Sequence, residues 1–185
     1  MQIFFPKEED HEIRATILPE VAKKFTDLGI EVLIESGLGE KVFVSDELYV
    51  EAGATVCNEK TKGFGSADVV CKINKPNLEE IQSLRKNSIY ISFLDPFNET
   101  QIVSDLAAAD VSSISMELVP RITRAQKMDA LSSQANLAGY AAVIEASRTL
   151  SKSFPMMMTA AGTISPARVF VVGVGVAGLQ AIATA

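Results

Sequence analysis

The first 117 residues alternate short apolar runs with stretches of helical periodicity, and this alternation restricts the chain to few folds. The apolar runs predict buried strands, and the stretches between them predict helices. The expected strands are residues 3–5, 30–34, 54–57, 69–72, 89–93 and 111–116, and the expected helices are 19–28, 45–52, 78–84 and 100–108. Near-continuous apolar strands joined by helices indicate a parallel sheet covered on both faces. The sequence therefore predicts an α/β domain.

Residues at the helix ends support this prediction. Pro19 is suited to the first helical position, and Gly29 can provide the left-handed residue that ends the same helix. Ser45 can cap the next helix, which Gly53 ends in the same way.

The pattern changes after Pro120. Residues 126–150 contain no proline and one glycine, with apolar residues at helical spacing, which predicts one long helix. The Phe-Pro-Met-Met-Met run at 154–158 ends it, and we expect these Met side chains to pack at a domain junction. Residues 169–172 then predict a strand that leads through a glycine turn into a helix.

The expected organisation has three parts: an α/β domain over residues 1–125, a connecting helix over 126–152, and the start of a second α/β domain over 153–185. The last 17 residues are nearly all apolar, but three glycines and one glutamine favour a strand, turn and helix over a membrane span. Because no strand remains to complete the second domain, we expect it to be truncated and the chain to be a fragment. The fold class expected is two Rossmann- or flavodoxin-like parallel-sheet domains, the second incomplete.

Composition excludes several classes of function. The chain is 48% apolar, which rules out disorder, and its net charge of −6 without a basic cluster argues against nucleic acid as a partner. A single His, two Cys and no CxxC pair nearly exclude a zinc site, a His-dependent hydrolase and a disulfide scaffold, so we expect no metal site. The N-terminus lacks the apolar core of a signal peptide, which favours a reducing compartment.

Gly173, Gly175 and Gly178 form a G-x-G-x-x-G fingerprint between the expected strand and helix. In this context the first glycine allows a tight turn, the second lets a diphosphate approach the backbone, and the third lets helix and strand pack closely. The N-terminus of the helix then faces the phosphates. A turn that only packs helix against strand is the alternative. The acidic residue that distinguishes NAD from NADP would lie beyond Ala185, so the fingerprint leaves that choice open.

A second group of polar residues precedes the long helix: Arg121, Gln126, Asp129 and Ser132. It follows the strand that ends near Glu117, at the carboxyl edge of the sheet, where open α/β sheets bind ligands. A cation, an amide, a carboxylate and a hydroxyl can orient a carboxamide and a ribose, with an Arg–Asp pair fixing the loop. On chemistry alone, the favoured alternative is that Asp129 and Ser132 cap the helix while Arg121 is solvated.

Longer stretches carry a family resemblance. The run PRITRAQKMDALSSQANLAGYAAVIEA, the TAAG at 159–162, the segment ARVFVVGVGVAGLQAIATA and the N-terminal FPKE resemble the NAD(H)-binding alpha subunit, or first domain, of proton-translocating NAD(P) transhydrogenase. Glu35 to Gly39 fit the same family, so the resemblance spans nearly the whole chain.

The resemblance implies roles for named residues. Arg121, Gln126, Asp129 and Ser132 would form a catalytic loop near the nicotinamide and its ribose. The cofactor-binding residues would be Gln126, Lys127, Met128, Asp129, Gly173, Gly175, Val176 and Gly178.

It also implies an activity. Hydride would pass directly between NAD(H) here and NADP(H) on a partner domain, coupled to proton translocation by a transmembrane domain of the same complex. The chain would be a soluble domain on the cytosolic or matrix face of the membrane, a homodimer at full length, and inactive with weak or absent NAD binding as an isolated fragment.

Alanine dehydrogenase is the competing family, because it resembles the same chain over both domains. That enzyme has a substrate-binding Lys in a K-x-K-E-P segment and a catalytic His after the next strand. Here Asn74 occupies the Lys position and residues 94–96, Leu-Asp-Pro, occupy the place of the His. Arg14 matches the remaining substrate residue, but we favour a structural ion pair for it, and we expect His11 to lie on the surface. A nucleotide-sensing or purely structural module is the third hypothesis.

Overall fold

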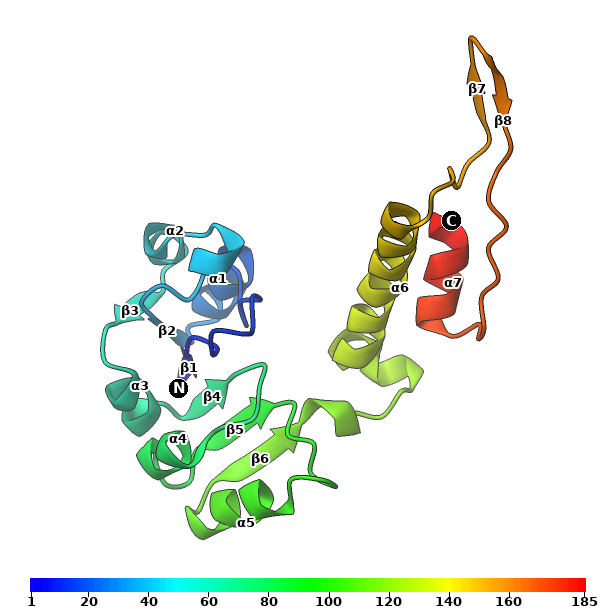
Figure 1. The fold of residues 1–185 in the computed structure, drawn as a ribbon. Helices are drawn as coiled ribbons and strands as arrows, with labels where there is room; N and C mark the ends of the chain where they lie inside the picture. The colour runs from blue at the N-terminus through cyan, green and yellow to red at the C-terminus, as the bar shows by residue number, and fades with distance from the viewer. The chain divides into compact units, whose positions relative to one another are not determined.

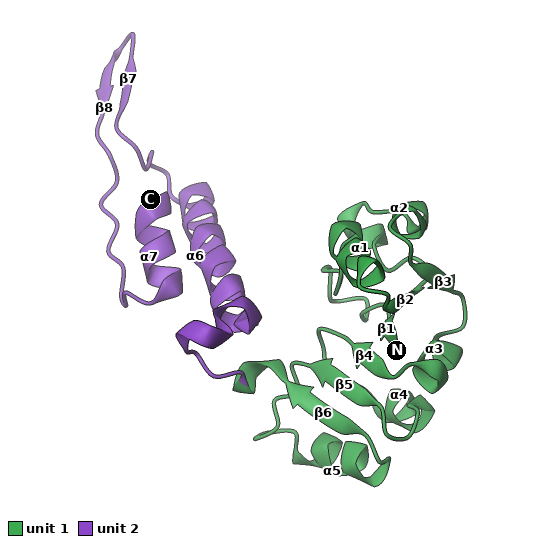
Figure 2. Cartoon of the chain, turned by 180° about the vertical axis from the view of Figure 1, so that it is seen from behind, with its two compact units in different colours: residues 1–118 green, residues 119–185 purple.

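The computed structural model describes residues 1–185, which form two compact units (Figure 2). Unit 1 comprises Met1–Leu118 and unit 2 comprises Val119–Ala185. The sequence places the boundary after residue 125, further along the chain. The strand-rich part ends earlier because a short 3-10 helix, η2 (Met116–Leu118), follows its last strand directly.

Unit 1 is built on one sheet of six parallel strands in the order β3-β2-β1-β4-β5-β6 (Figure 1). The order reverses between β1 and β4, as in doubly wound dinucleotide-binding folds. The predicted α/β class is confirmed. The strands are β1 (Gln2–Phe5), β2 (Glu31–Glu35), β3 (Thr55–Cys57), β4 (Val69–Cys71), β5 (Ile89–Ser92) and β6 (Ser112–Ser115).

Helices cover both faces of this sheet, so alternate residues of a central strand enter different cores. Ile3 and Phe5 of β1 pack with residues of α1 and α2, whereas Phe4 packs with residues of α3, α4 and α5. This two-sided burial explains why the strands are almost continuously apolar. The helices are α1 (Pro19–Asp27), α2 (Asp46–Glu51), α3 (Lys60–Ser66), α4 (Leu78–Ser83) and α5 (Thr100–Ala108).

Helix α3 is absent from the sequence prediction because Gly63 and Gly65 are poor helix formers. Packing explains the first of them. A Cβ atom at Gly63 would lie within 2.6 Å of ring carbons of Phe4, so only glycine lets α3 approach the sheet this closely. The predicted helix ends hold at Gly29 and Gly53, whose φ angles are +77° and +87°. Ser45 is the N-cap of α2, but its side chain makes no capping hydrogen bond.

Unit 2 contains the long helix α6 (Ala130–Thr149), a hairpin of β7 (Met157–Thr159) and β8 (Gly162–Ile164), and helix α7 (Val176–Thr184). Helices α6 and α7 pack side by side (Figures 1 and 2). The helix expected from residue 126 begins at Ala130 because Asp129 is its N-cap, and residues before the cap form the 3-10 helix η3 (Thr123–Met128).

Two expectations for unit 2 are wrong. Residues 169–172 form no strand, because no other strand pairs with them, and the Phe170 side chain is 90% exposed. The Met run does not pack at a junction: Met157 and Met158 belong to β7, and Met156 to Met158 are all exposed. None of the helices is both long enough and apolar enough to cross a lipid bilayer.

Candidate functional site

An open pocket of about 570 Å³ lies within unit 2, where η3, the start of α6 and the start of α7 meet. The four polar residues singled out from the sequence all line it, and so does Val176 from the glycine turn. Two motifs separated along the chain thus share one pocket. Its wall comprises Arg121, Ile122, Thr123, Gln126, Asp129, Ser132, Ser133 and Val176.

Asp129 and Ser132 are held together at the start of α6. The backbone N–H of Ser132 donates to Asp129 Oδ1 at 2.8 Å, and the Ser132 hydroxyl donates to Oδ2 at 2.6 Å. Asp129 is therefore the N-cap of the long helix, as the simpler interpretation of the sequence predicts. Because the Ser132 hydroxyl donates its proton to Asp129, its lone pairs remain available to accept a hydrogen bond from a ligand.

Asp129 is held in its ionised form. Hydrogen bonds from the side chain and the backbone of Ser132 lower the pKa of Asp129, and the positive charge of Arg121 lowers it further. Arg121 acts through its charge alone, since the two side chains form no hydrogen bond. The expected Arg–Asp pair is therefore not a salt bridge, and the Arg121 guanidinium stays on the exposed pocket wall.

The three glycines of the fingerprint differ in what surrounds them. Gly173 has a φ angle of +99°, which only glycine adopts readily. A Cβ atom at Gly178 would lie 2.9 Å from the carbonyl carbon of Gly173, so the turn folds tightly onto the helix there. At Gly175 a Cβ atom would meet no protein atom within 4 Å. The second glycine of the fingerprint thus borders open space, where a ligand can approach the backbone.

Helix α7 begins directly after that open position. Gly175 is its N-cap and supplies no side-chain capping group, so the first backbone N–H groups of α7 have no side-chain acceptor. A helix start of this kind is suited to an anion, because unpaired N–H groups and the positive end of the helix dipole face outward. Val176, the first helical residue, reaches the pocket.

Not every residue expected at the site lies on the pocket wall. Lys127 and Met128 belong to η3 but are exposed and do not line the pocket. Conversely, Ile122, Thr123 and Ser133 line it and are absent from the sequence prediction. Their only signal in the sequence is that each adjoins a predicted residue or lies one helical turn from one.

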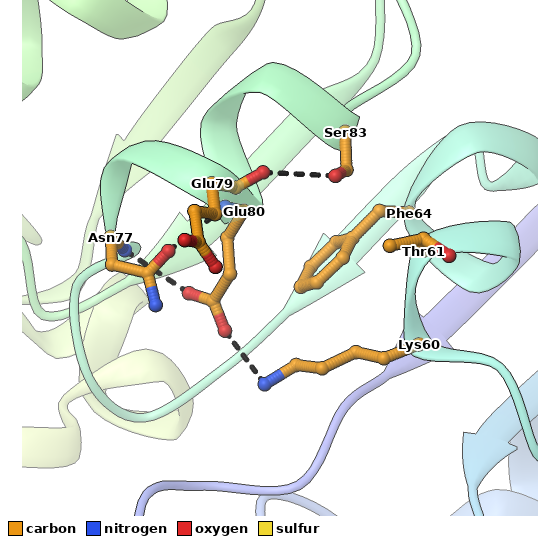
Figure 3. A pocket seen from close by; sticks show the side chains of 7 residues that line it. All are labelled: Lys60, Thr61, Phe64, Asn77, Glu79, Glu80 and Ser83. Atoms are coloured by element: carbon orange, nitrogen blue, oxygen red, sulfur yellow. Dashed lines mark hydrogen bonds and ion pairs between the residues drawn. The ribbon is translucent and has the colours of Figure 1, made fainter.

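A smaller pocket of about 150 Å³ lies in unit 1 between α3 and α4 (Figure 3). Lys60 points across it toward Glu80, with Nζ 2.7 Å from Oε1. The fully buried Lys72 donates to both oxygens of Glu80 at 2.9 Å. Burial alone would raise the pKa of Glu80, but the two ammonium groups outweigh it and lower that pKa.

Glu80 also accepts the backbone N–H of Asn77 and completes a capping box at the start of α4. It thus joins α3, α4 and the end of β4 through one carboxylate. We interpret this network, which the sequence does not reveal, as a structural joint.

The positions that correspond to a dehydrogenase substrate site are occupied by contacts within the chain. Arg14 binds Glu12 through two side-chain hydrogen bonds of 2.8 and 2.6 Å, so the predicted structural ion pair is confirmed. The Asn74 amide donates to Glu8 at 3.0 Å. His11 lies on the surface, as expected, with its side chain 71% exposed.

The sheet order of unit 1 and the glycine turn of unit 2 place the chain among Rossmann-like α/β proteins. The model of the alanine dehydrogenase/PNT N-terminal domain matches residues 4–138, and that of the corresponding C-terminal domain matches residues 142–185. The chain therefore belongs to the alanine dehydrogenase/PNT family.

Named relatives fall on both sides of that family. The chain is 45% identical to an NAD(P) transhydrogenase alpha subunit of Rhodospirillum rubrum, over all of this chain and 50% of the relative. It is 27% identical to alanine dehydrogenase of Methanococcus maripaludis, over 98% of this chain and 49% of that enzyme. The chain thus spans about half the length of these relatives.

Solved structures agree. A transhydrogenase from Sinorhizobium meliloti matches with a TM-score of 0.94 at 45% identity, over all of this chain and 55% of that one. An L-alanine dehydrogenase matches with a TM-score of 0.85 at 23% identity, over 99% of this chain and 51% of that one, which supports the shared fold.

Proposed function

We propose that this chain is the NAD(H)-binding component of an NAD(P) transhydrogenase. The observation that carries the proposal is the single pocket that joins Gln126, Asp129 and Ser132 to the start of α7, directly after the open position at Gly175. The 45% identity to a transhydrogenase alpha subunit supports it.

The groups around the pocket fit a nicotinamide dinucleotide. The Asp129 carboxylate and the Ser132 hydroxyl can accept hydrogen bonds from a carboxamide NH₂ or a ribose hydroxyl, and the Gln126 amide can both donate and accept. The unpaired N–H groups of α7 suit a diphosphate, which can approach the backbone because no side chain is present at Gly175. At about 570 Å³, the pocket is of the size that small-molecule sites usually have.

NAD(H), when bound, supplies a hydride that leaves C4 of its dihydronicotinamide with both bonding electrons and forms the new C–H bond at C4 of NADP⁺ on a partner domain. This exchange needs no general acid or base, so the chain contributes by orienting the ring and excluding water. The Asp129–Ser132 pair holds its acceptors in fixed positions, because both side chains are already hydrogen-bonded to each other.

Three further features belong to the same proposal. A transmembrane domain of the complex would couple hydride transfer to proton translocation. The chain would be a peripheral part on the cytosolic or matrix face of that membrane, and the full-length protein would be a homodimer. The NADP(H)-binding domain and the transmembrane domain would be its partners.

An amino-acid dehydrogenase is the second candidate, supported by the alanine dehydrogenase relative. It fits the structure less well. A keto acid needs a cation to polarise it and a group that shuttles a proton, yet Lys72 is bound to Glu80, Arg14 is bound to Glu12, and the position of the expected lysine holds Asn74.

The test is to mix the natural full-length protein with its NADP(H)-binding partner and to follow hydride exchange between NADH and an NADP⁺ analogue. We expect exchange that depends on the partner, and a loss of about tenfold or more in NADH affinity in Gly175→Val, whose side chain would occupy the open space. Gly65→Ala in α3 is the control, because its Cβ atom would meet only Ser83 O at 3.8 Å. Turnover of alanine and NAD⁺ without a partner would establish the dehydrogenase instead, and failure to bind NADH would leave a structural module.

A further inference from the structure

Gly139 lies in the middle of α6, where the backbone of α7 comes unusually close. A Cβ atom at this position would lie 2.9 Å from the carbonyl carbon and 3.0 Å from the Cα of Ala177, and nearer still to the carbonyl oxygen. These are backbone atoms, which cannot rotate away as a side chain can. Any side chain at residue 139 must therefore push the first turn of α7 away from α6.

Glycine in a helix interior costs about 0.5–1 kcal/mol relative to alanine, so its presence calls for a packing or functional reason. Close packing supplies part of it, because Gly139 is buried against α7. The location of the contact supplies more. Ala177 directly follows Val176, which lines the pocket, and Gly175, the N-cap of α7.

The two helices each carry one half of the proposed dinucleotide site. Helix α6 begins with the Asp129–Ser132 pair, and α7 begins with the uncapped N–H groups. The backbone contact at Gly139 is thus a point at which the separation of these two halves is set.

We propose that Gly139 is a positioning residue that fixes the distance between the diphosphate-binding turn on α7 and the nicotinamide-binding patch on α6. This inference rests on the proposed function. A dinucleotide consists of two linked halves, and the gain from linking them depends on the protein presenting both subsites at the matching separation. Displacement of α7 leaves each subsite able to bind its own half but prevents both from binding well at once.

The experiment compares NADH with its halves. Isothermal titration of the natural full-length protein measures the affinities for NADH, ADP and nicotinamide mononucleotide. We expect Gly139→Ala to weaken NADH binding by about tenfold or more, while the affinities for ADP and for the mononucleotide change by less than about threefold. The selective loss is informative because loss of stability alone would weaken all three ligands together.

Two controls separate positioning from packing. Val143→Ala removes buried apolar volume one turn further along α6, on the same face, without adding an atom near Ala177. It should lower the melting temperature and leave the ratio of NADH to ADP affinity unchanged. Gly65→Ala in α3 tests a glycine-to-alanine change where space exists.

The outcomes are distinct. Equal losses for NADH, ADP and the mononucleotide in Gly139→Ala, or an unchanged NADH affinity, would overturn the positioning role while leaving the proposed function intact. Failure of the unmodified protein to bind NADH would overturn both. If Gly139→Ala does not fold, Ala177→Gly loosens the backbone that Gly139 contacts without adding an atom. A several-fold selective loss of NADH affinity is then expected, and no change would refute the proposal.

Discussion

The carboxylate of Asp129 receives two hydrogen bonds from one residue, Ser132: one from its backbone N–H at 2.8 Å and one from its hydroxyl at 2.6 Å. Both side chains also line the pocket of unit 2. The two interpretations of these residues from the sequence, helix cap and ligand site, are therefore compatible. The group that begins α6 is also exposed to the pocket.

Substitutions of Asp129 can separate these two roles. Asp129→Ala removes the cap and should lower the free energy of unfolding by about 1 kcal/mol, whereas Asp129→Asn, an equally good cap, should change it by about 0.3 kcal/mol or less. Both variants lose the charge, so both should weaken NADH binding several-fold in the full-length protein. Urea denaturation and NADH titration measure the two effects. Normal NADH binding by the Asn variant would show that the carboxylate acts only as a cap.

The Arg14–Glu12 pair should give the protein an acid-dependent contribution to stability. Hydrogen bonds from the Arg14 side chain lower the pKa of Glu12 from 4.5 to about 2. Because the folded-state pKa is depressed, the stabilisation is complete above about pH 4.5 and is lost as the pH falls toward 2.

Arg14→Ala should therefore be destabilised by about 1 kcal/mol or less at pH 7, with the difference from the unmodified protein shrinking below pH 4.5. Urea midpoints measured across this pH range provide the test. Lys23→Ala, which breaks the exposed Lys23–Asp27 pair, is the control. A difference that stays constant as the pH is lowered from neutrality toward 2 would contradict the assignment.

The Glu80 network should be sensitive to loss of its carboxylate. Glu80→Gln would leave the fully buried Lys72 ammonium without a counter-charge, which we expect to cost about 3–5 kcal/mol. Lys60 is 33% exposed, so Lys60→Ala should cost only about 1 kcal/mol. Urea denaturation followed by circular dichroism measures both. Similar losses in the two variants would mean that Lys72 does not depend on Glu80.

Two glycines of one helix should respond in opposite ways to the same substitution. Gly63→Ala places a methyl group against the Phe4 ring and should destabilise the protein by about 1–3 kcal/mol. Gly65→Ala, in the same helix but with space for a methyl group, should stabilise α3 by about 0.5–1 kcal/mol. Thermal melts of both variants decide the point. Stabilisation by both would show that α3 can move away from the sheet.

Most of unit 1 follows from sequence pattern, because a strand buried on both faces leaves a clear apolar run. Helix α3 does not, since its helical state depends on the close approach of Gly63 to Phe4, a contact between distant parts of the chain. In unit 2 the apolar run at 169–172 predicts a strand, but a strand needs a paired neighbour, and none lies beside this segment.

The site divides in the same way. Arg121, Gln126, Asp129 and Ser132 could be selected from their chemistry and from family resemblance, and the structure gathers them with Val176 around one pocket. Gly139 carries no chemical group, and only the structure reveals which backbone it meets.

The Lys60–Glu80–Lys72 network could not be predicted for a similar reason. Its members come from α3, α4 and the end of β4, and no spacing in the sequence links them. Their ion pairs exist only because the sheet brings these elements together.

The uncapped start of α7 has a consequence for how this helix is maintained. Its first N–H groups lack a side-chain acceptor, so in the free protein they depend on water and should exchange their hydrogens with solvent quickly. An anion seated there would take over as the missing cap, slowing that exchange and extending order along the helix. Recognition of a ligand and completion of α7 would then be a single thermodynamic event.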